Sequence, residues 1–299
     1  MMPFQSHKQL EAQCFEAFTP PIGVTEPTGI RHGLIFASPH SGRVYPKGLT
    51  RRSHLPLSVL RRNEDAHMDK VVAQLEEYGF PTLQAFFPRC FVDVNRSPDE
   101  LLPEWQSDEG GSEQAVTARA AAGLGVIPTV IAENLPIYKT TLPPSVVKAR
   151  IEQLYNPYHS ALQSLLGNAR RRAGMALLLD CHSMPGMSIS GKKRHDIVLG
   201  DRFGTSSDPE FMRIAEAVFT EAGYSVGHNY PYAGGYVTST YGQPYNSVHV
   251  IQIEVNRQIY MNPVSFKRLA GFEKLQSTFV RLGETLRPYV GHEVPRAAE

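Results

Sequence analysis

The sequence feature that most constrains the fold is a series of short apolar runs that alternate with helical patterns. Such runs are typical of strands buried on both faces of a parallel sheet. The strand-like runs are GLIFAS (33–38), FVDVNR (Phe91–Arg96), MALLLDCHSM (175–184), DIVLG (196–200) and VHVIQIEVNR (248–257). The sequence predicts helices over about 63–78, 146–172 with a kink or break at Pro157, 208–222 and 263–286. We therefore expect an α/β fold of three layers, α/β/α, around a central twisted sheet that is mostly parallel or mixed.

Neither an internal repeat nor a clear linker divides the chain. We expect residues 1–30, which end in a Pro-, Thr- and Gly-rich loop, to form an N-terminal arm. Residues 31–299 are expected to form a single domain. Within it, a stretch at about 97–142 lacks a periodic pattern and is predicted to be a loop-rich insertion.

Charge and composition exclude several classes of protein. Thirty Lys and Arg face 29 Asp and Glu, and no block of one sign stands out, so we expect neither a nucleic-acid nor a membrane partner. The apolar runs are far shorter than the ~20 residues of a membrane-spanning helix. Three scattered cysteines, Cys14, Cys90 and Cys181, fit a reducing compartment better than a disulfide framework, so we expect a cytoplasmic protein. The oligomeric state has no signal in the sequence.

Polar side chains end or interrupt four of the predicted strands. In open α/β sheets ligands bind beyond the carboxyl ends of the strands, so these side chains are candidates for one site. They are His40, the group Asp93, Asn95 and Arg96, the pair Asp180 and His182, and the pair Glu254 and Arg257.

His, Asp and Glu at separate strand ends are the residue types that a zinc hydrolase needs. A catalytic zinc ion takes three ligands from His and carboxylate groups, keeps one position for water, and lowers the pKa of that water to ~7. His40 and His182 are the candidate imidazole ligands, and Asp65 or Glu64 is the candidate acidic ligand. Glu254, which is not a ligand in this scheme, is the candidate base that moves the proton.

Each of these residues also has a structural interpretation. A histidine after a strand is often buried and bonded to the backbone, and Asp65 is well placed to cap a helix. Glu254 is harder to explain in this way, because an acid within VHVIQI is costly to bury unless it is paired or functional. Ser41 and Ser183 lack a G-x-S-x-G context, and Cys181 should point to the opposite face from His182.

At these residues the sequence resembles the N-formylglutamate amidohydrolase family. The motifs that carry the resemblance occur in order from about residue 33 to 262. They are SPHSGRVYP (Ser38–Pro46), EDAHMDKV (Glu64–Val71), VDVNRSP (Val92–Pro98), DCHSMPG (Asp180–Gly186), DIVLGDRFG (Asp196–Gly204) and IEVNRQIYM (Ile253–Met261). A more distant similarity is to zinc carboxypeptidases and to the aspartoacylase and succinylglutamate desuccinylase group, which implies a zinc-carboxypeptidase-like (phosphorylase/hydrolase-like) fold.

The resemblance implies one Zn²⁺ per chain, or another divalent ion, held by His40, His182 and an acid between them. The carboxypeptidase-like pattern puts that acid three residues after the first His, where this chain has Arg43. The acidic ligand is therefore assigned to Asp65, with Glu64 as the alternative.

The resemblance also implies roles around the metal. Arg96 and Asn95 would hold a substrate carboxylate or the reacting carbonyl oxygen, with Asp93 orienting them and Asp180 in support. Glu254 matches the glutamate that acts as general base and acid. Arg257 and Tyr260 would bind a carboxylate or brace Glu254.

The implied activity is hydrolysis of N-formyl-L-glutamate to formate and L-glutamate in histidine catabolism. Such a small-molecule carboxylate substrate needs a second cation besides Arg96, and the candidates are Arg257, Arg43, Arg202 and Arg194. Two other functions stay open: a metallo-carboxypeptidase or peptide amidase, and a non-catalytic homologue that binds a carboxylate.

Overall fold

The computed structural model describes residues 6–105, 116–131, 134–188 and 190–291. Parts of the predicted insertion, 106–115 and 132–133, lie outside the described residues. The chain groups into two compact units. The first unit comprises Met1–Gly23, His40–Glu64 and Ala85–Ser160, and the second comprises Val24–Pro39, Asp65–Gln84 and Ala161–Glu299. The single domain over 31–299 stays a prediction.

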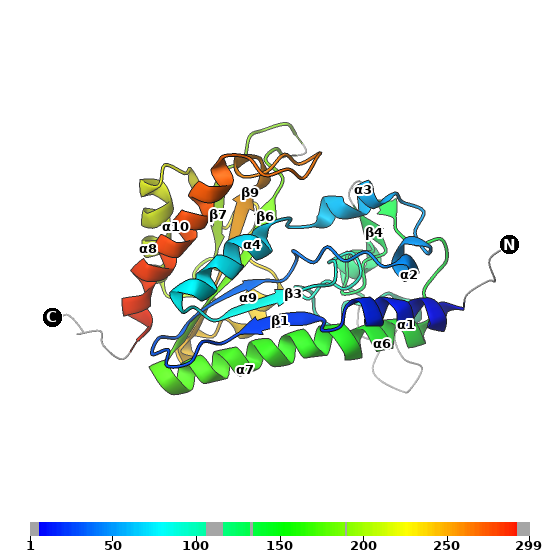
Figure 1. Ribbon diagram of the computed structural model, residues 1–299, viewed down its shortest axis with the longest axis horizontal. Coiled ribbons are helices and arrows are strands. Elements are labelled where there is room, and N and C mark those ends of the chain that lie inside the picture. Colours follow the sequence, from blue (N-terminus) through cyan, green and yellow to red (C-terminus); the bar gives the residue numbers. More distant parts are fainter. Residues whose placement is uncertain (1–5, 106–115, 132–133, 189, 292–299) are drawn as a thin grey trace. The chain divides into compact units, whose positions relative to one another are not determined.

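A mixed sheet of seven strands, in the order β1-β3-β2-β6-β9-β7-β8, confirms the predicted α/β class (Figure 1). The strands are β1 (Ile22–Thr25), β2 (Leu34–Ser38), β3 (Thr82–Ala85), β6 (Ala176–Met184), β7 (Ile197–Gly200), β8 (Val226–His228) and β9 (Val248–Asn256). β2 pairs in parallel with β3 and β6, β6 with β9, and β7 with β8. β7 is antiparallel to β9. A separate two-stranded sheet joins β4 (Val130–Ile131) to β5 (Leu135–Pro136).

The helices of the first unit are α1 (His7–Ala17), α2 (Lys47–Thr50), α3 (Leu57–Leu60), α5 (Ala118–Ala121) and α6 (Pro144–Arg150). The helices of the second unit are α4 (Met68–Ala73), α8 (Pro209–Glu221), α9 (Tyr236–Tyr241) and α10 (Gly271–Leu286), and α7 (Asn156–Ala173) has residues in both units. Asp208 caps α8 by accepting a hydrogen bond from the Glu210 amide, and Pro209 occupies the first turn.

The alternation of side chains along the central strands separates two faces of the sheet. Leu177, Leu179 and Cys181 of β6 belong to the main hydrophobic core, together with Ile251 and Ile253 of β9. The apolar faces of α4, α8 and α10 complete this core, and Figure 1 shows α4 and α10 in front of the strands. Asp180 and His182 of β6 and Gln252 and Glu254 of β9 alternate with these core residues and therefore point to the opposite face.

Three predicted elements were wrong or misplaced. The helix predicted over about 63–78 is α-helical only over Met68–Ala73 and continues as a 3-10 turn over Gln74–Tyr78. Phe91–Arg96 is not a strand, because the Phe91 amide donates to the Pro88 carbonyl in a turn and the Asp93 amide donates to Val126. The final helix begins at Gly271 rather than near 263. The Asn262 side chain accepts hydrogen bonds from the Val264 and Ser265 amides, which holds that segment in a turn.

The predicted kink at Pro157 takes the form of a π-helical turn. Ile151–Tyr155 is π-helical and joins α6 to α7, so that the helical path continues past the proline. Proline lacks an amide hydrogen and its ring clashes with the carbonyl four residues earlier in a regular α-helix. A wider turn at this point removes that conflict.

The first unit contains a buried group of charges that we call the Arg150 cluster: Glu11, Arg52, Tyr138 and Arg150. Arg150 is fully buried, and its Nε donates to Glu11 Oε1 at 2.7 Å while its Nη1 donates to the Tyr138 hydroxyl at 2.7 Å. Arg52 forms an ion pair with the other oxygen of Glu11. The guanidinium of Arg150 also lies 3.6 Å from the centre of the Phe91 ring.

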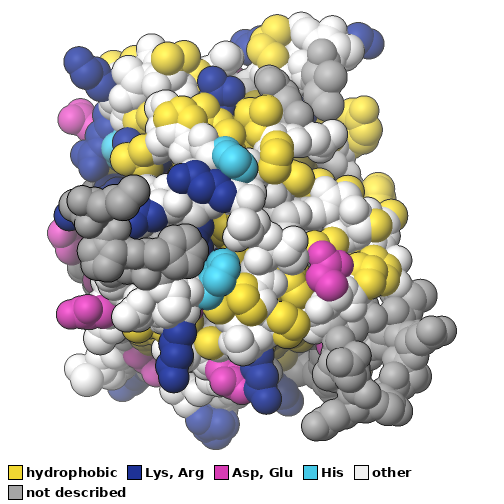
Figure 2. Space-filling model, turned by 90° about the vertical axis from the view of Figure 1, so that its right-hand side faces the viewer, with side chains coloured by type: hydrophobic (Ala, Val, Ile, Leu, Met, Phe, Trp, Pro, Cys, Tyr) yellow, Lys and Arg dark blue, Asp and Glu magenta, His cyan; other side chains and the backbone are white. Residues whose placement is uncertain are grey.

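Basic and acidic side chains are interspersed on the face shown in Figure 2, in keeping with the formal net charge of +1. Within the described ranges, no helix combines the length and the apolar character that crossing a membrane requires.

Candidate functional site

Polar side chains lie on one face of the central strands, and the opposite face packs in the hydrophobic core. Asp180 and His182 of β6 and Gln252 and Glu254 of β9 are spaced by two residues, so each pair points the same way. The strands pair in parallel with Asp180 opposite Gln252 and His182 opposite Glu254. All four side chains are buried. The two-residue period of the strands therefore brings these groups together near the carboxyl end of the sheet.

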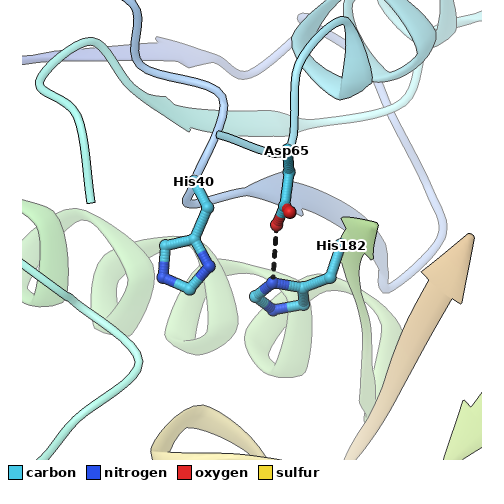
Figure 3. Close-up of side chains that lie close together, drawn as sticks. All are labelled: His40, Asp65 and His182. Atoms are coloured by element: carbon cyan, nitrogen blue, oxygen red, sulfur yellow. Dashed lines mark hydrogen bonds and ion pairs between the residues drawn. The ribbon is translucent and has the colours of Figure 1, made fainter. Parts of the chain in front are cut away.

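His182 lies between two carboxylates. Its Nε2 donates to Asp180 Oδ2 at 2.8 Å, and its Nδ1 is 3.2 Å from Asp65 Oδ2, the contact drawn as a dashed line in Figure 3. Burial alone would lower the pKa of His182, yet Asp180, Asp65 and Glu254 raise it well above its usual value. We call Asp65, Asp180, His182, Ser183, Glu254 and Arg257 the His182 cluster.

Asp65 is held in place from two sides. Arg257 Nη2 pairs with Asp65 Oδ1 at 3.0 Å, and the Ser183 hydroxyl donates to the same oxygen at 3.0 Å. Arg257 Nε in turn donates to Ser183 Oγ at 3.0 Å. Arg257 thus holds a candidate metal ligand. Tyr260 is fully buried and its hydroxyl donates to the Ala66 carbonyl at 2.9 Å, which fixes the backbone next to Asp65.

The candidate base Glu254 is buried and has a neighbour on its own strand. Gln252 Nε2 donates to Glu254 Oε1 at 2.9 Å, which orients the carboxylate. The alternative acid Glu64 has a different setting, because Arg61 binds it through Nε and Nη2 at 2.8 and 3.1 Å. Asp65, rather than Glu64, is therefore the candidate acidic ligand that contacts His182.

In the first unit, His40 has a carboxylate partner of its own. Its Nε2 is 2.8 Å from Asp93 Oδ1, and Arg89 Nη2 donates to Asp93 Oδ2 at 2.7 Å. Burial alone would raise the pKa of Asp93, but Arg89, His40 and Arg96 hold it well below its usual range. Asp93 is therefore an ionised partner of His40, and it also accepts a hydrogen bond from the Asn95 amide at 2.9 Å.

Arg96 and Asn95 lie in the turn-rich segment that replaces the predicted strand. Arg96 Nε donates to the Leu124 carbonyl at 3.1 Å and its Nη1 donates to the Asn95 carbonyl at 2.9 Å. Glu100 lies 4.0 Å from Arg96 Nε. These backbone contacts fix the direction of the guanidinium.

The candidate ligands Asp65 and His182 meet within the second unit, where both are buried and His182 Nδ1 lies 3.2 Å from Asp65 Oδ2 (Figure 3). The candidate ligand His40 is buried in the first unit. In each histidine, Nε2 is bonded to an aspartate, as is common for histidines that bind a metal through the other ring nitrogen.

The donor chemistry fits a divalent cation. Asp65, Asp180 and Glu254 place three carboxylates around His182, and Asp180 Oδ1 is buried and has no hydrogen-bond partner among the residues that the structure describes. Both ring nitrogens of His182 can donate a hydrogen bond to a carboxylate, Nε2 to Asp180 and Nδ1 to Asp65, only if the imidazole carries both protons. A cation bound at Nδ1 would take the place of one proton and offset the excess negative charge.

Some members of the site were missed by sequence reasoning. Gln252 was not singled out, although its two-residue spacing from Glu254 places it on the same face. Ser183 was considered only as a nucleophile, yet it bridges Asp65 and Arg257. No sequence signal pointed to Arg89 as the partner of Asp93.

Comparisons with known proteins identify what this chain is similar to. A family model described as N-formylglutamate amidohydrolase matches residues 32–261. A Pseudomonas putida protein named N-formylglutamate deformylase is 31% identical over 202 residues, which cover 66% of this chain and 70% of that protein. The protein of the same name from Pseudomonas aeruginosa is 30% identical over 203 residues, covering 66% and 71%.

A solved structure is also similar to this chain, and it too is an N-formylglutamate amidohydrolase. The crystal structure of N-formylglutamate amidohydrolase from Ralstonia eutropha JMP134 superposes with a TM-score of 0.83 and 32% sequence identity. The match covers 90% of this chain and 98% of that one. These similarities confirm the family resemblance of the six motifs.

Proposed function

We propose a function from one premise: this chain belongs to the N-formylglutamate amidohydrolase family, whose model matches residues 32–261. The chain is thus an enzyme, an amidohydrolase. We propose that it hydrolyses N-formyl-L-glutamate to formate and L-glutamate, and that it acts in histidine catabolism. The observation that carries the proposal is the buried His182 cluster, where a carboxylate held by Gln252 lies on the same sheet face as a candidate metal ligand.

We further propose that one Zn²⁺, or another divalent ion, is held by His40, Asp65 and His182. Two imidazoles and one carboxylate are a ligand set found in catalytic zinc sites. A bound ion would polarise the formyl carbonyl and make a water molecule acidic enough to react near neutral pH. Asp93 and Asp180 would keep the two imidazoles in the tautomer and orientation that binding requires.

Glu254 is proposed as the group that moves the proton. It takes a proton from the attacking water as the oxygen bonds to the formyl carbon, and it delivers that proton to the leaving nitrogen as the C–N bond breaks. The products are formate and the amine of glutamate, so no covalent enzyme intermediate is required. The hydrogen bond from Gln252 orients the carboxylate of Glu254 for this transfer.

Arg96 and Asn95 are proposed to bind a carboxylate of the substrate or the reacting carbonyl oxygen. The planar guanidinium of arginine matches a carboxylate through two parallel hydrogen bonds. Arg257 is less suited to this task than the sequence alone indicates, because it pairs with Asp65.

The direction of β7 favours Arg194 as the second cation for a dicarboxylic substrate. β7 is antiparallel to β9, with Ile197 opposite Val255, so the residues before β7 lie at the edge where β6 and β9 end. The Arg194 amide donates to the Gly186 carbonyl at 2.9 Å, just beyond β6. Arg202 follows β7 and therefore lies at the opposite edge.

The proposed chemistry is tested by Glu254→Gln, which keeps the size and the hydrogen-bonding ability of the side chain but removes the base. We expect kcat to fall by ~10²-fold or more while zinc content and thermal stability stay unchanged. The matched control is Glu273→Gln on α10, which makes the same chemical change at an exposed position. Full turnover by Glu254→Gln would reject the role of Glu254.

The substrate is tested with a panel of N-formyl, N-acetyl and N-succinyl amino acids and short peptides. The proposal expects the highest kcat/KM for N-formyl-L-glutamate. Preference for peptides would instead support the metallo-carboxypeptidase or peptide amidase. Binding of these carboxylates without turnover would support the non-catalytic homologue.

The role of Arg194 is tested against that of Arg202. Arg194→Ala should raise KM for N-formyl-L-glutamate by roughly tenfold or more but leave KM for N-formylglycine unchanged, because only the first substrate has a side-chain carboxylate. Arg202→Ala, the control at the other edge of the sheet, should change neither KM. An equal effect of both variants on both substrates would remove Arg194 from the site.

A further inference from the structure

A large cavity lies in the second unit, at the end of the sheet where β2 and β6 begin. Its volume is about 830 Å³, and it is lined by the loop before β2, the turn before β3, the end of α7 and the residues after α10. The register of β2 and β6 places this loop beside the first residues of β6, whereas His182 lies near the last. At a strand rise of ~3.3 Å per residue, roughly 20 Å separate this cavity from His182.

The charged side chains that line the cavity are all cationic. Arg31, Arg172 and Arg287 contribute guanidinium groups, and no acidic side chain is among the described lining residues. Arg172 pairs with Glu26 at 2.6 Å and Arg287 with Glu284 at 2.9 Å. Arg31 is exposed and has no ion pair within the part of the chain that the structure describes. Among the described residues, acidic side chains therefore offset the positive charge of the cavity only in part.

Two further observations show that this positive charge is not fully satisfied. Arg172 Nη2 and Arg287 Nε are buried and have no hydrogen-bond partner in the described part of the chain. Burial, with Arg287 and Arg172, lowers the pKa of His32 in the cavity wall to about 4, so this histidine is neutral at pH 7. His32 Nδ1 accepts a hydrogen bond from the Leu34 amide at 3.3 Å. The charge of the cavity is thus carried by the three arginines.

We propose that this cavity binds the phosphate groups of a small molecule through Arg31, Arg172 and Arg287. Arginine matches phosphate oxygens with its planar set of donors and stays charged at every physiological pH. The volume lies within the range of small-ligand sites and exceeds what a single phosphate needs. The ring of Tyr78, which is 44% exposed, offers a surface for a flat apolar group such as a nucleotide base. The phosphates come from a nucleotide or from an inorganic polyphosphate.

The proposal is tested by calorimetric titration of the full chain with ADP, pyrophosphate and adenosine at low salt. Binding of ADP alone supports a nucleotide site, and binding of both ADP and pyrophosphate supports a polyphosphate site. Adenosine, which lacks phosphate, should not bind in either case. Absence of heat from ADP and pyrophosphate at millimolar concentration, or equal binding of adenosine, overturns the proposal.

Arg31→Glu is the variant that connects the binding to this cavity. Because Arg31 is exposed and makes no ion pair among the described residues, its replacement should leave the fold and kcat for N-formyl-L-glutamate unchanged. We expect it to weaken phosphate binding by roughly tenfold or more. Lys148→Glu makes the same change in net charge at an exposed position that does not line the cavity. Equal affinities of the two variants would place the bound phosphate elsewhere.

Discussion

The Arg150 cluster and the His182 cluster are both buried groups of charges, but their balance differs. In the Arg150 cluster a single carboxylate, Glu11, receives two guanidinium groups, and the surplus donors of Arg150 bond to a hydroxyl and a carbonyl. In the His182 cluster three carboxylates share one guanidinium and one imidazole. In the Arg150 cluster almost every charged or polar group has a hydrogen-bond or ion-pair partner within the cluster or the nearby backbone. The His182 cluster instead has an excess of negative charge.

This difference shows that burial of charge does not by itself mark a functional site. Arginine carries five donors, so it can distribute its charge over backbone carbonyls, hydroxyls and aromatic faces. A carboxylate only accepts hydrogen bonds, and several of them together need an external cation. The sign and the balance of a buried cluster are therefore more informative than its depth.

The largest effect that the comparison predicts is a loss of stability on breaking the Arg150 cluster. Arg150→Met should lower the free energy of unfolding by about 3–5 kcal/mol, because it removes one of the two cations that neutralise the buried Glu11. Urea denaturation measures this effect. The activity of the folded enzyme should change by less than about twofold, since the proposed chemistry does not use Arg150.

Arg170→Met is the control, because it removes an exposed arginine from α7. It should change the free energy of unfolding by less than about 0.5 kcal/mol. If Arg150→Met reduced activity without lowering stability, the Arg150 cluster would have a functional role and the contrast between the clusters would fail.

The next largest predicted effect is a gain in stability when zinc binds, because a cation would offset the excess negative charge of the His182 cluster. At a free zinc concentration of 100 times its Kd, binding to the folded state should raise the free energy of unfolding by about 2.7 kcal/mol. The expected rise in Tm is roughly 5 °C, and chelation should reverse it. Asp65→Asn should abolish the rise because it removes an acidic ligand.

Asp208→Asn serves as the control for Asp65→Asn, since asparagine also caps a helix and the position lies at the start of α8. It should keep the full zinc-dependent rise in Tm. A rise of equal size in Asp65→Asn would place the zinc site outside the His182 cluster.

The smallest effect is expected at Cys181, which is adjacent to His182 in sequence but packs in the hydrophobic core. Burial and then the neighbouring Asp180 raise the pKa of this thiol well above its usual value, so it stays protonated. Cys181→Ala should lower the free energy of unfolding by about 1 kcal/mol and change kcat/KM by less than about twofold. A loss of activity comparable to that of Glu254→Gln would show that Cys181 takes part in the chemistry.

The two clusters also differ in how far the sequence predicts them. His182 and Glu254 interrupt apolar runs, and a polar residue in such a run is a local signal that points to the carboxyl edge of the sheet. Glu11 lies 139 positions from Arg150, and their pairing has no local pattern. The sequence predicts an N-terminal arm over residues 1–30, and Glu11 lies in this segment, on α1.

The fold was predictable where periodicity is strong. β6, β9 and α8 lie close to their expected limits. Phe91–Arg96 was misassigned because apolar residues can be buried in a turn as well as in a strand, and only the partner of the Asp93 amide distinguishes the two. The roles of Arg257 and Asp93 were open for the same reason: each depends on which distant side chain it meets, Asp65 or His40.

The strict alternation along β6 limits how genes for such chains can diverge. Substitution of one aliphatic residue by another at Leu177 or Leu179 alters only the core side. Gain or loss of a single codon between Leu177 and His182 would exchange the two sides of the strand, turning His182 toward the core and Cys181 toward the reactants. We therefore expect functional descendants to conserve the length of this segment more strictly than its composition.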